Sequence, residues 1–147
     1  MSHTYTQNVV HIVFSTKDRR RTIPPNLQER LWPYMAGICK NLGAFLHAIG
    51  GTEDHVHLLI EIPAALSLSK AVQDIKTNSS RWVSGERQIF AWQKGYGAFS
   101  VSHSSASSVI RYIENQEKHH KKMTFDHEFV SLLKKHGMAF DPQYVFG

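Results

Sequence analysis

The stretch GGTEDHVHLLIEI, residues 50–62, predicts a β-strand that begins after a glycine turn. From His55 onward its side chains alternate between two faces, because successive residues of a strand point in opposite directions. One face would carry only aliphatic residues, namely Val56, Leu58, Ile60 and Ile62. That face is expected to lie under a helical layer, which leaves His55 and His57 on the opposite face.

Strands and helices alternate on either side of this strand. Apolar periodicity predicts five further elements around it: a strand at 8–15, a helix at 26–42, a strand at 44–49, a helix at 68–82 and a strand at 95–103. This order is that of a ferredoxin-like α+β fold, an antiparallel sheet with helices over one face. The other face of the sheet is then expected to stay open for a ligand.

The C-terminal part of the chain adds a helix that carries a tyrosine. A serine-rich turn precedes a helical pattern at residues 107–121, and a weaker pattern follows at 125–136. In the first helix, Tyr112 and Gln116 would stand one above the other, because helical positions four apart share a face. We expect one domain over residues 1–147, with a core at about 8–121 and a C-terminal helix and tail at 122–147.

The composition indicates a basic protein with a single apolar core. Hydrophobic residues make up 41% of the chain, and Lys plus Arg exceed Asp plus Glu by 17 to 12, which favours a polyanionic partner. The one cysteine, Cys39, excludes an internal disulfide and is expected to be a reduced core thiol. The chain shows neither a signal-peptide pattern nor an apolar run of roughly 18 residues, so we expect a cytoplasmic protein without membrane association.

The histidine pair has two interpretations. His55 and His57 point to the same side of the strand, about 6 to 7 Å apart, and two imidazoles at that spacing can bind one metal ion. A catalytic metal usually takes about three protein ligands, so the pair alone is incomplete. The alternative is that both are polar residues on the wet face of a half-exposed strand. A third ligand and a nucleophile elsewhere in the chain would favour the metal site.

The predicted helix at 107–121 offers both groups. Tyr112 presents a phenol, which is a competent nucleophile toward phosphorus once its proton is withdrawn, and Gln116 presents a carboxamide beside it. The alternative is that Tyr112 packs against its apolar neighbours without any chemical role. The basic sequence KHHKK at residues 118–122 matches either a phosphate-contacting patch or a solvated helix end.

Taken together, these motifs resemble those of the HUH-type single-tyrosine transposases of small bacterial insertion sequences, the insertion-sequence-200-like class, and of their relatives associated with repetitive extragenic palindromes. HUH denotes histidine, hydrophobic residue, histidine, here His55, Val56 and His57. The second motif of these transposases is matched by YIENQ, residues 112–116, and the opening HIVFSTKDRRR, residues 11–21, is similar as well. The resemblance covers about residues 9–120.

The resemblance implies a site and a reaction. His55, His57 and Gln116 would bind a divalent ion, magnesium or manganese, and Tyr112 would attack a DNA phosphodiester. The products would be a 5′-phosphotyrosine link and a free 3′-hydroxyl, followed by strand transfer. The substrate would be single-stranded DNA at the hairpin ends of an insertion sequence. The implied protein is a homodimer, commonly with the tyrosine helix of one subunit completing the site of the other, so assembly in cis or in trans stays open.

Basic residues along the chain are candidates for contacting the DNA backbone, since Lys and Arg follow the phosphates while bases stack on aromatic side chains. The candidates lie in the turn after the first strand and in the second helix: Lys17, Arg19, Arg20, Arg21, Lys76 and Arg81. Each could equally be a solubilising surface charge. Trp82 and Trp92 are expected in the core rather than stacked on bases.

Two other functions fit the same motifs. One is a catalytically idle or domesticated single-stranded nucleic-acid-binding protein of the same fold, in which His55 and His57 contact phosphate or water. The other is a metal-dependent phosphodiesterase that uses activated water in place of Tyr112. Formation of a covalent protein–DNA adduct separates both from the transposase.

Overall fold

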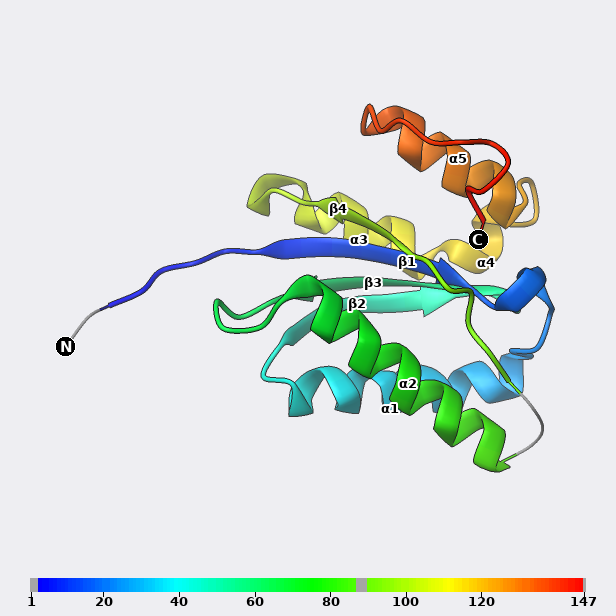
Figure 1. The fold of residues 1–147 in the computed structure, drawn as a ribbon, viewed down its shortest axis with the longest axis horizontal. Helices are drawn as coiled ribbons and strands as arrows, with labels where there is room; N and C mark the ends of the chain where they lie inside the picture. Colours follow the sequence, from blue (N-terminus) through cyan, green and yellow to red (C-terminus); the bar gives the residue numbers. More distant parts are fainter. Residues whose placement is uncertain (1–2, 87–89, 147) are drawn as a thin grey trace.

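Four strands form one antiparallel sheet at the centre of the molecule (Figure 1). The computed structural model describes residues 3–86 and 90–146. The strands are β1 (Val9–Ser15), β2 (Phe45–Gly51), β3 (His55–Glu61) and β4 (Gly97–Ser100), in the order β2-β3-β1-β4. The helices are α1 (Pro25–Asn41), α2 (Leu68–Glu86), α3 (Ala106–Glu114), α4 (Gln116–His119) and α5 (Phe125–Lys135), with short 3-10 turns η1 (Lys17–Arg19) and η2 (His103–Ser105). The predicted ferredoxin-like α+β order is confirmed.

The first face of the sheet lies against α1 and α2 (Figure 1). Val56, Leu58 and Ile60 of β3 are completely buried in this layer, as the alternation in the sequence predicts. Phe14 of β1 joins them, and its ring meets the Trp92 ring edge-on with centroids 4.8 Å apart. The core of the domain is therefore the aliphatic row of β3 together with the same-facing residues of β1.

The second face of the sheet is covered, and the prediction that it would stay open is wrong. Helix α3 packs Ile113 against β2 and β3, while α5 packs Phe125, Phe129 and Leu133 against β1 and β4 (Figure 1). Both helices are amphipathic, and a short helix is stable only when its apolar face is buried against something. The apolar residues on the second face of the sheet are the surface against which α3 and α5 pack. His55 and His57 therefore lie inside the molecule.

The helix predicted at 107–121 is two helices, because the chain breaks helical geometry between them. Asn115 has φ −102° and ψ 20°, which ends α3, and its side-chain amide donates to the Arg111 carbonyl at 2.8 Å. Helix α4 begins at the next residue, Gln116.

Among the described helices, none combines the length and the apolar character that crossing a membrane requires.

A glycine of β2 allows α3 to approach the sheet. A Cβ atom added at Gly50 would collide with the backbone carbonyl of Ile113 in α3. A backbone atom of a helix cannot rotate away as a side chain can. We expect Gly50→Ala to lower the free energy of unfolding by about 1–3 kcal/mol, because α3 would have to shift away from β2. Gly37→Ala is the matched control, since Gly37 faces open space within α1 and should gain about 0.5–1 kcal/mol. Urea unfolding of both variants measures the two changes.

Candidate metal and tyrosine site

Two histidines and a glutamine meet beneath the second helical layer. His55 and His57 come from β3 and are completely buried, with ring centroids 5.2 Å apart. Gln116, the first residue of α4, places its Oε1 2.8 Å from His55 Nε2. The sequence placed these three side chains on one predicted site, and the fold brings them together within one chain. Helix α3, which carries Tyr112, therefore packs on the sheet of the same chain.

Each of the two histidines has a second partner that fixes its ring. His55 Nδ1 lies 2.7 Å from Asp54 Oδ1 and 3.0 Å from Thr52 Oγ1. His57 Nδ1 lies 2.8 Å from Nε2 of His11, a residue of β1. Hydrogen bonds of this kind hold an imidazole in one orientation and leave its other nitrogen for a metal ion. In both rings the remaining nitrogen is Nε2.

A glutamate of α5 enters the same space. Glu128 is 1% exposed, and its Oε1 lies 3.0 Å from His57 Nε2 and 3.6 Å from His55 Nε2. The Tyr112 hydroxyl donates to Glu128 Oε2. The carboxylate therefore connects the tyrosine of α3 with the histidine pair of β3.

The group is arranged as a metal ligand set. His55, His57, His120 and Glu128 each offer one atom, and these atoms lie within 4.8 Å of one another. His120 Nε2 is buried without a hydrogen-bond partner among the described residues, although Glu128 Oε1 is 3.0 Å away. Such an orphaned nitrogen is costly unless it has a ligand. Imidazoles and one carboxylate are a donor set that divalent metal ions accept, so the residues present fit a metal ion.

Burial and charge shift the acid–base properties of the site. Burial raises the pKa of the Tyr112 phenol above its usual range, and the negative charge of Glu128 raises it further. Burial alone would raise the pKa of Glu128 as well, but contacts with His120 and His57 outweigh it and hold that pKa well below its usual range. Without a cation at the site, Tyr112 is therefore a protonated phenol that donates to an ionised carboxylate.

Acid should begin to destabilise the protein just below pH 6.5, above the range in which most carboxylates titrate. Burial lowers the pKa of His57 to about 4 and that of His11 to about 3, from 6.5. Because the unfolded chain binds these protons more readily, stability is complete above pH 6.5 and falls toward pH 4.5 by up to about 1.4 kcal/mol per pH unit for each histidine. Urea midpoints of the metal-free protein measured across this window should decline with falling pH, and less steeply in His11→Gln. Equal midpoints at pH 6.5 and 4.5 would contradict the shifts.

The predicted DNA-contacting residues divide into two groups. Lys17, Arg20 and Arg21 are exposed in the turn after β1, near the end of the sheet that carries His55. Arg19 in the same turn already forms an ion pair, since its Nε lies 3.0 Å from Asp126 of α5. Its guanidinium carbon is also 5.0 Å from the Phe146 ring centroid, a cation–π contact.

The two candidates in α2 lie in the helical layer on the far side of the sheet from Tyr112 (Figure 1). Arg81 is exposed there. Lys76 Nζ donates to three backbone carbonyls, of residues 93, 94 and 95, and burial lowers its pKa to about 8. Lys76 thus fastens the segment before β4 to α2. A role of any of these six residues in DNA binding remains a prediction.

The expected core positions are confirmed for Trp92 and Cys39, while Trp82 is only partly buried against the core. Trp92 is buried and donates from Nε1 to Ser79 Oγ at 2.9 Å, and Trp82 is half-buried with its ring stacked on Tyr34 at 4.8 Å. Cys39 is a buried free thiol whose pKa is raised to about 11 by burial. None of the three lies at the histidine site.

The family assignment follows from the sequence pattern. The family described as "Transposase IS200 like" matches residues 4–116, which include both histidines, Tyr112 and Gln116. The chain belongs to this family. The match ends at Gln116, so the segment of this IS200-like transposase that contributes His120 and Glu128 lies outside the matched region. A comparison with curated proteins found no match.

Solved structures show that the fold is shared. A transposase candidate from Deinococcus radiodurans R1 is 22% identical, with a TM-score of 0.65 over 79% of this chain and 95% of that one. A REP-associated tyrosine transposase, solved bound to a REP hairpin, is 13% identical, with a TM-score of 0.58 over 77% of this chain and 68% of that one. At these identities the likeness concerns the fold alone.

Three residues of the candidate site were not predicted as site residues from the sequence. His11, His120 and Glu128 are 46, 63 and 71 positions from His57, so no local spacing connects them with the histidine pair. The only signal was for His11, which alternation places on the same face of the first strand as Val13. In the sheet Val13 is paired with His57, and His11 is its diagonal neighbour.

Proposed function

We propose that this IS200-like transposase cleaves and rejoins single-stranded DNA through Tyr112. The Tyr112 hydroxyl gives up its proton as its oxygen forms a bond to the phosphorus. The bond between that phosphorus and the 3′ oxygen breaks, and the 3′ oxygen takes up a proton and leaves as a hydroxyl. A 3′-hydroxyl of another strand can reverse the attack, so rejoining needs no nucleotide cofactor. The observation that carries this proposal is the meeting of Tyr112 with both histidines and Gln116 in one chain.

The residues around Tyr112 have distinct roles in this proposal. His55, His57 and Gln116 would hold a divalent metal ion, magnesium or manganese, and His120 and Glu128 offer further ligand atoms beside the two imidazoles. Asp54 and His11 keep the imidazoles oriented toward the ion. The ion supplies positive charge that offsets the charge developing on the phosphate oxygens. Glu128 Oε2 accepts the hydrogen of the Tyr112 hydroxyl and so aims the phenol into the site.

The substrate we propose is a hairpin end of an insertion sequence presented as single-stranded DNA. Three observations support it: the family, the fold shared with a protein solved on a REP hairpin, and the exposed cations Lys17, Arg20 and Arg21 near the site. We also propose a homodimer, because one tyrosine cannot hold two cut ends. In that dimer each subunit would carry a complete site, since Tyr112 and Gln116 reach the histidines of their own chain.

A single assay tests the proposal. The protein is incubated with single-stranded oligonucleotides from the flanks of its own gene and with Mg²⁺ or Mn²⁺, and the products are separated under denaturing conditions. A protein–DNA adduct that survives denaturation and releases a fragment with a free 3′-hydroxyl supports the tyrosine mechanism. Cleavage without an adduct points to the phosphodiesterase that uses water. Binding without cleavage with either metal points to the idle nucleic-acid-binding protein.

A further inference from the structure

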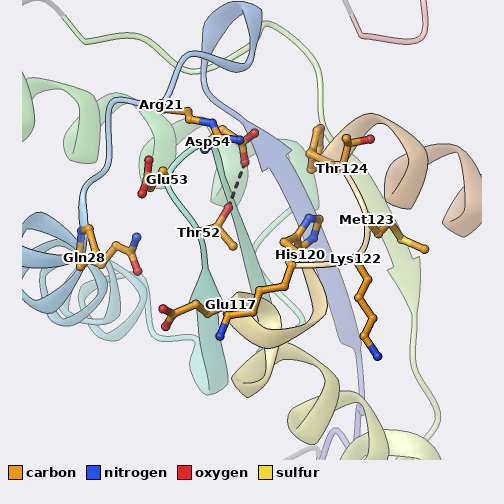
Figure 2. A pocket seen from close by; sticks show the side chains of 13 residues that line it. Arg21, Gln28, Thr52, Glu53, Asp54, Glu117, His120, Lys122, Met123 and Thr124 are labelled. Carbon is orange, nitrogen blue, oxygen red and sulfur yellow. Dashed lines mark hydrogen bonds between the residues drawn. The ribbon is translucent and has the colours of Figure 1, made fainter.

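A cavity of about 520 Å³ opens beside the tyrosine site, between the turn after β2, the start of α1 and the segment joining α4 to α5 (Figure 2). Four of its lining residues contact His55, namely Thr52, Asp54, His120 and Phe125. Asp54 Oδ1 lies 2.7 Å from His55 Nδ1, and the His120 ring centroid lies 4.3 Å from that of His55. A molecule held in this cavity would therefore adjoin the place where Tyr112 meets its substrate.

The cavity presents carboxylates and cations together. Within residues 3–86 and 90–146, five charged side chains of its lining form no hydrogen bond or ion pair: Arg21, Glu53, Glu117, Lys121 and Lys122. Carboxylates would repel a lone phosphate, and the lysines and the arginine would repel a lone metal ion. A nucleotide suits both kinds of group, because its phosphate is anionic while its base edge carries hydrogen-bond donors.

The acceptors on one wall define the base edge that fits. Gln28 donates from Nε2 to the Ile23 carbonyl at 2.9 Å, which fixes its side chain and leaves Oε1 as an acceptor. Glu53 is half-buried on the same wall, where its backbone carbonyl accepts from the Ile23 amide at 3.0 Å, and both residues are labelled in Figure 2. Two acceptors favour a base with an exocyclic amino group, which adenine, cytosine and guanine have and thymine lacks.

We propose that this cavity receives one amino-bearing nucleobase of the single-stranded substrate, next to the phosphate that Tyr112 attacks. The inference rests on the proposed function and adds to it a determinant of sequence preference. Glu53 and Gln28 accept hydrogen bonds from the base, and Lys121 and Lys122 lie near the adjoining phosphates. The volume is within the roughly 300–1,000 Å³ that ligand sites occupy.

Binding measured without cleavage tests the cavity. Fluorescence anisotropy with EDTA present compares single-stranded oligonucleotides in which each base within three positions of the cleavage point is replaced first by an abasic residue and then by thymine. We expect one position at which both replacements weaken binding by about tenfold, while the others change it less than twofold. Equal effects at all positions would overturn the proposal.

Two variants test whether Glu53 in the cavity causes the discrimination against thymine. In Glu53→Gln the discrimination against thymine at that position should fall to less than threefold, because the amide can donate to the thymine carbonyl as well as accept. Glu114→Gln is the control, since Glu114 is exposed on α3 outside the cavity, and it should discriminate like the wild type. Unchanged discrimination in Glu53→Gln would remove Glu53 from the site and overturn the assignment.

The adduct assay keeps the two proposals separate. An adduct together with uniform binding across all replaced positions overturns the nucleobase cavity and leaves the tyrosine mechanism intact. Position-specific binding that Glu53→Gln abolishes, in a protein that never forms an adduct, overturns the tyrosine mechanism and supports the cavity.

Discussion

Replacing Tyr112 by phenylalanine should abolish the covalent protein–DNA adduct while single-stranded DNA is still bound. Only the hydroxyl is lost, and it is the proposed nucleophile, so adduct formation should fall by at least about 10³-fold. The ring contacts that position this side chain, 5.7 Å to the His57 centroid and 5.2 Å to the His119 centroid, remain available to phenylalanine. Denaturing gels measure the adduct, and fluorescence anisotropy measures binding.

Tyr112→Phe should also lower the free energy of unfolding. Glu128 loses the donor at its Oε2, and an unsatisfied buried acceptor costs about 1–3 kcal/mol in the free energy of unfolding. Tyr144→Phe is the matched control, because Tyr144 is 68% exposed and its loss of a hydroxyl should change neither adduct nor stability. An adduct that persists in Tyr112→Phe would show that another side chain attacks the phosphate.

Replacing Glu128 by alanine should weaken metal binding by at least tenfold. Its carboxylate is the one anionic group in the ligand set of His55, His57, His120 and Glu128, and it also lies near the ring nitrogens of both histidines of β3. A metal at 100 times its dissociation constant stabilises a protein by about 2.7 kcal/mol, and at 10 times by about 1.4 kcal/mol. The Mn²⁺-dependent increase in unfolding free energy should therefore shrink by about half or more in the variant.

Glu114→Ala provides the comparison for this measurement, since Glu114 is an exposed glutamate of α3 outside the ligand set. It should keep the full Mn²⁺-dependent stabilisation. Titration calorimetry with Mn²⁺ gives the affinities independently of any DNA cleavage. If Glu128→Ala binds Mn²⁺ as tightly as the wild type, Glu128 serves only to hold Tyr112 and the ligand set is limited to other residues.

The sheet could be predicted because β3 carries an uninterrupted aliphatic row on one face. In β3, a shift of one residue would have moved Val56, Leu58 and Ile60 away from α1 and α2, so the pattern allowed a single orientation. The same alternation placed His55 and His57 on the second face, where the structure has them. Periodicity sufficed wherever one face of an element is continuously apolar.

The cover of the second face could not be predicted in the same way. The helical pattern at 125–136 is visible in the sequence, but its amphipathic face does not say which surface it meets. Packing of Phe129 and Leu133 against Val13 and Phe99 depends on contacts more than 25 residues apart in the chain. The prediction of an open face failed because helix-to-sheet docking is a tertiary effect.

The sequence predicted the residues of the tyrosine site that stand in motifs, but not the residues that support them. His55, His57, Tyr112 and Gln116 stand in two short motifs, so spacing and resemblance revealed them. Glu128 carried no such signal, because an acidic residue in the first turn of a helix ordinarily serves the helix dipole. Its burial among imidazoles becomes evident only when α5 is in place.

The central strand β1 links the site to the fold. All seven of its residues are buried, with His11 facing His57 on one side and Phe14 facing α1 and α2 on the other. A strand paired on both edges and covered on both faces does not open locally, so its exchange of amide hydrogens requires global unfolding. Loss of the proposed strand-transfer activity on heating should therefore coincide with the cooperative melting of the whole sheet and not precede it.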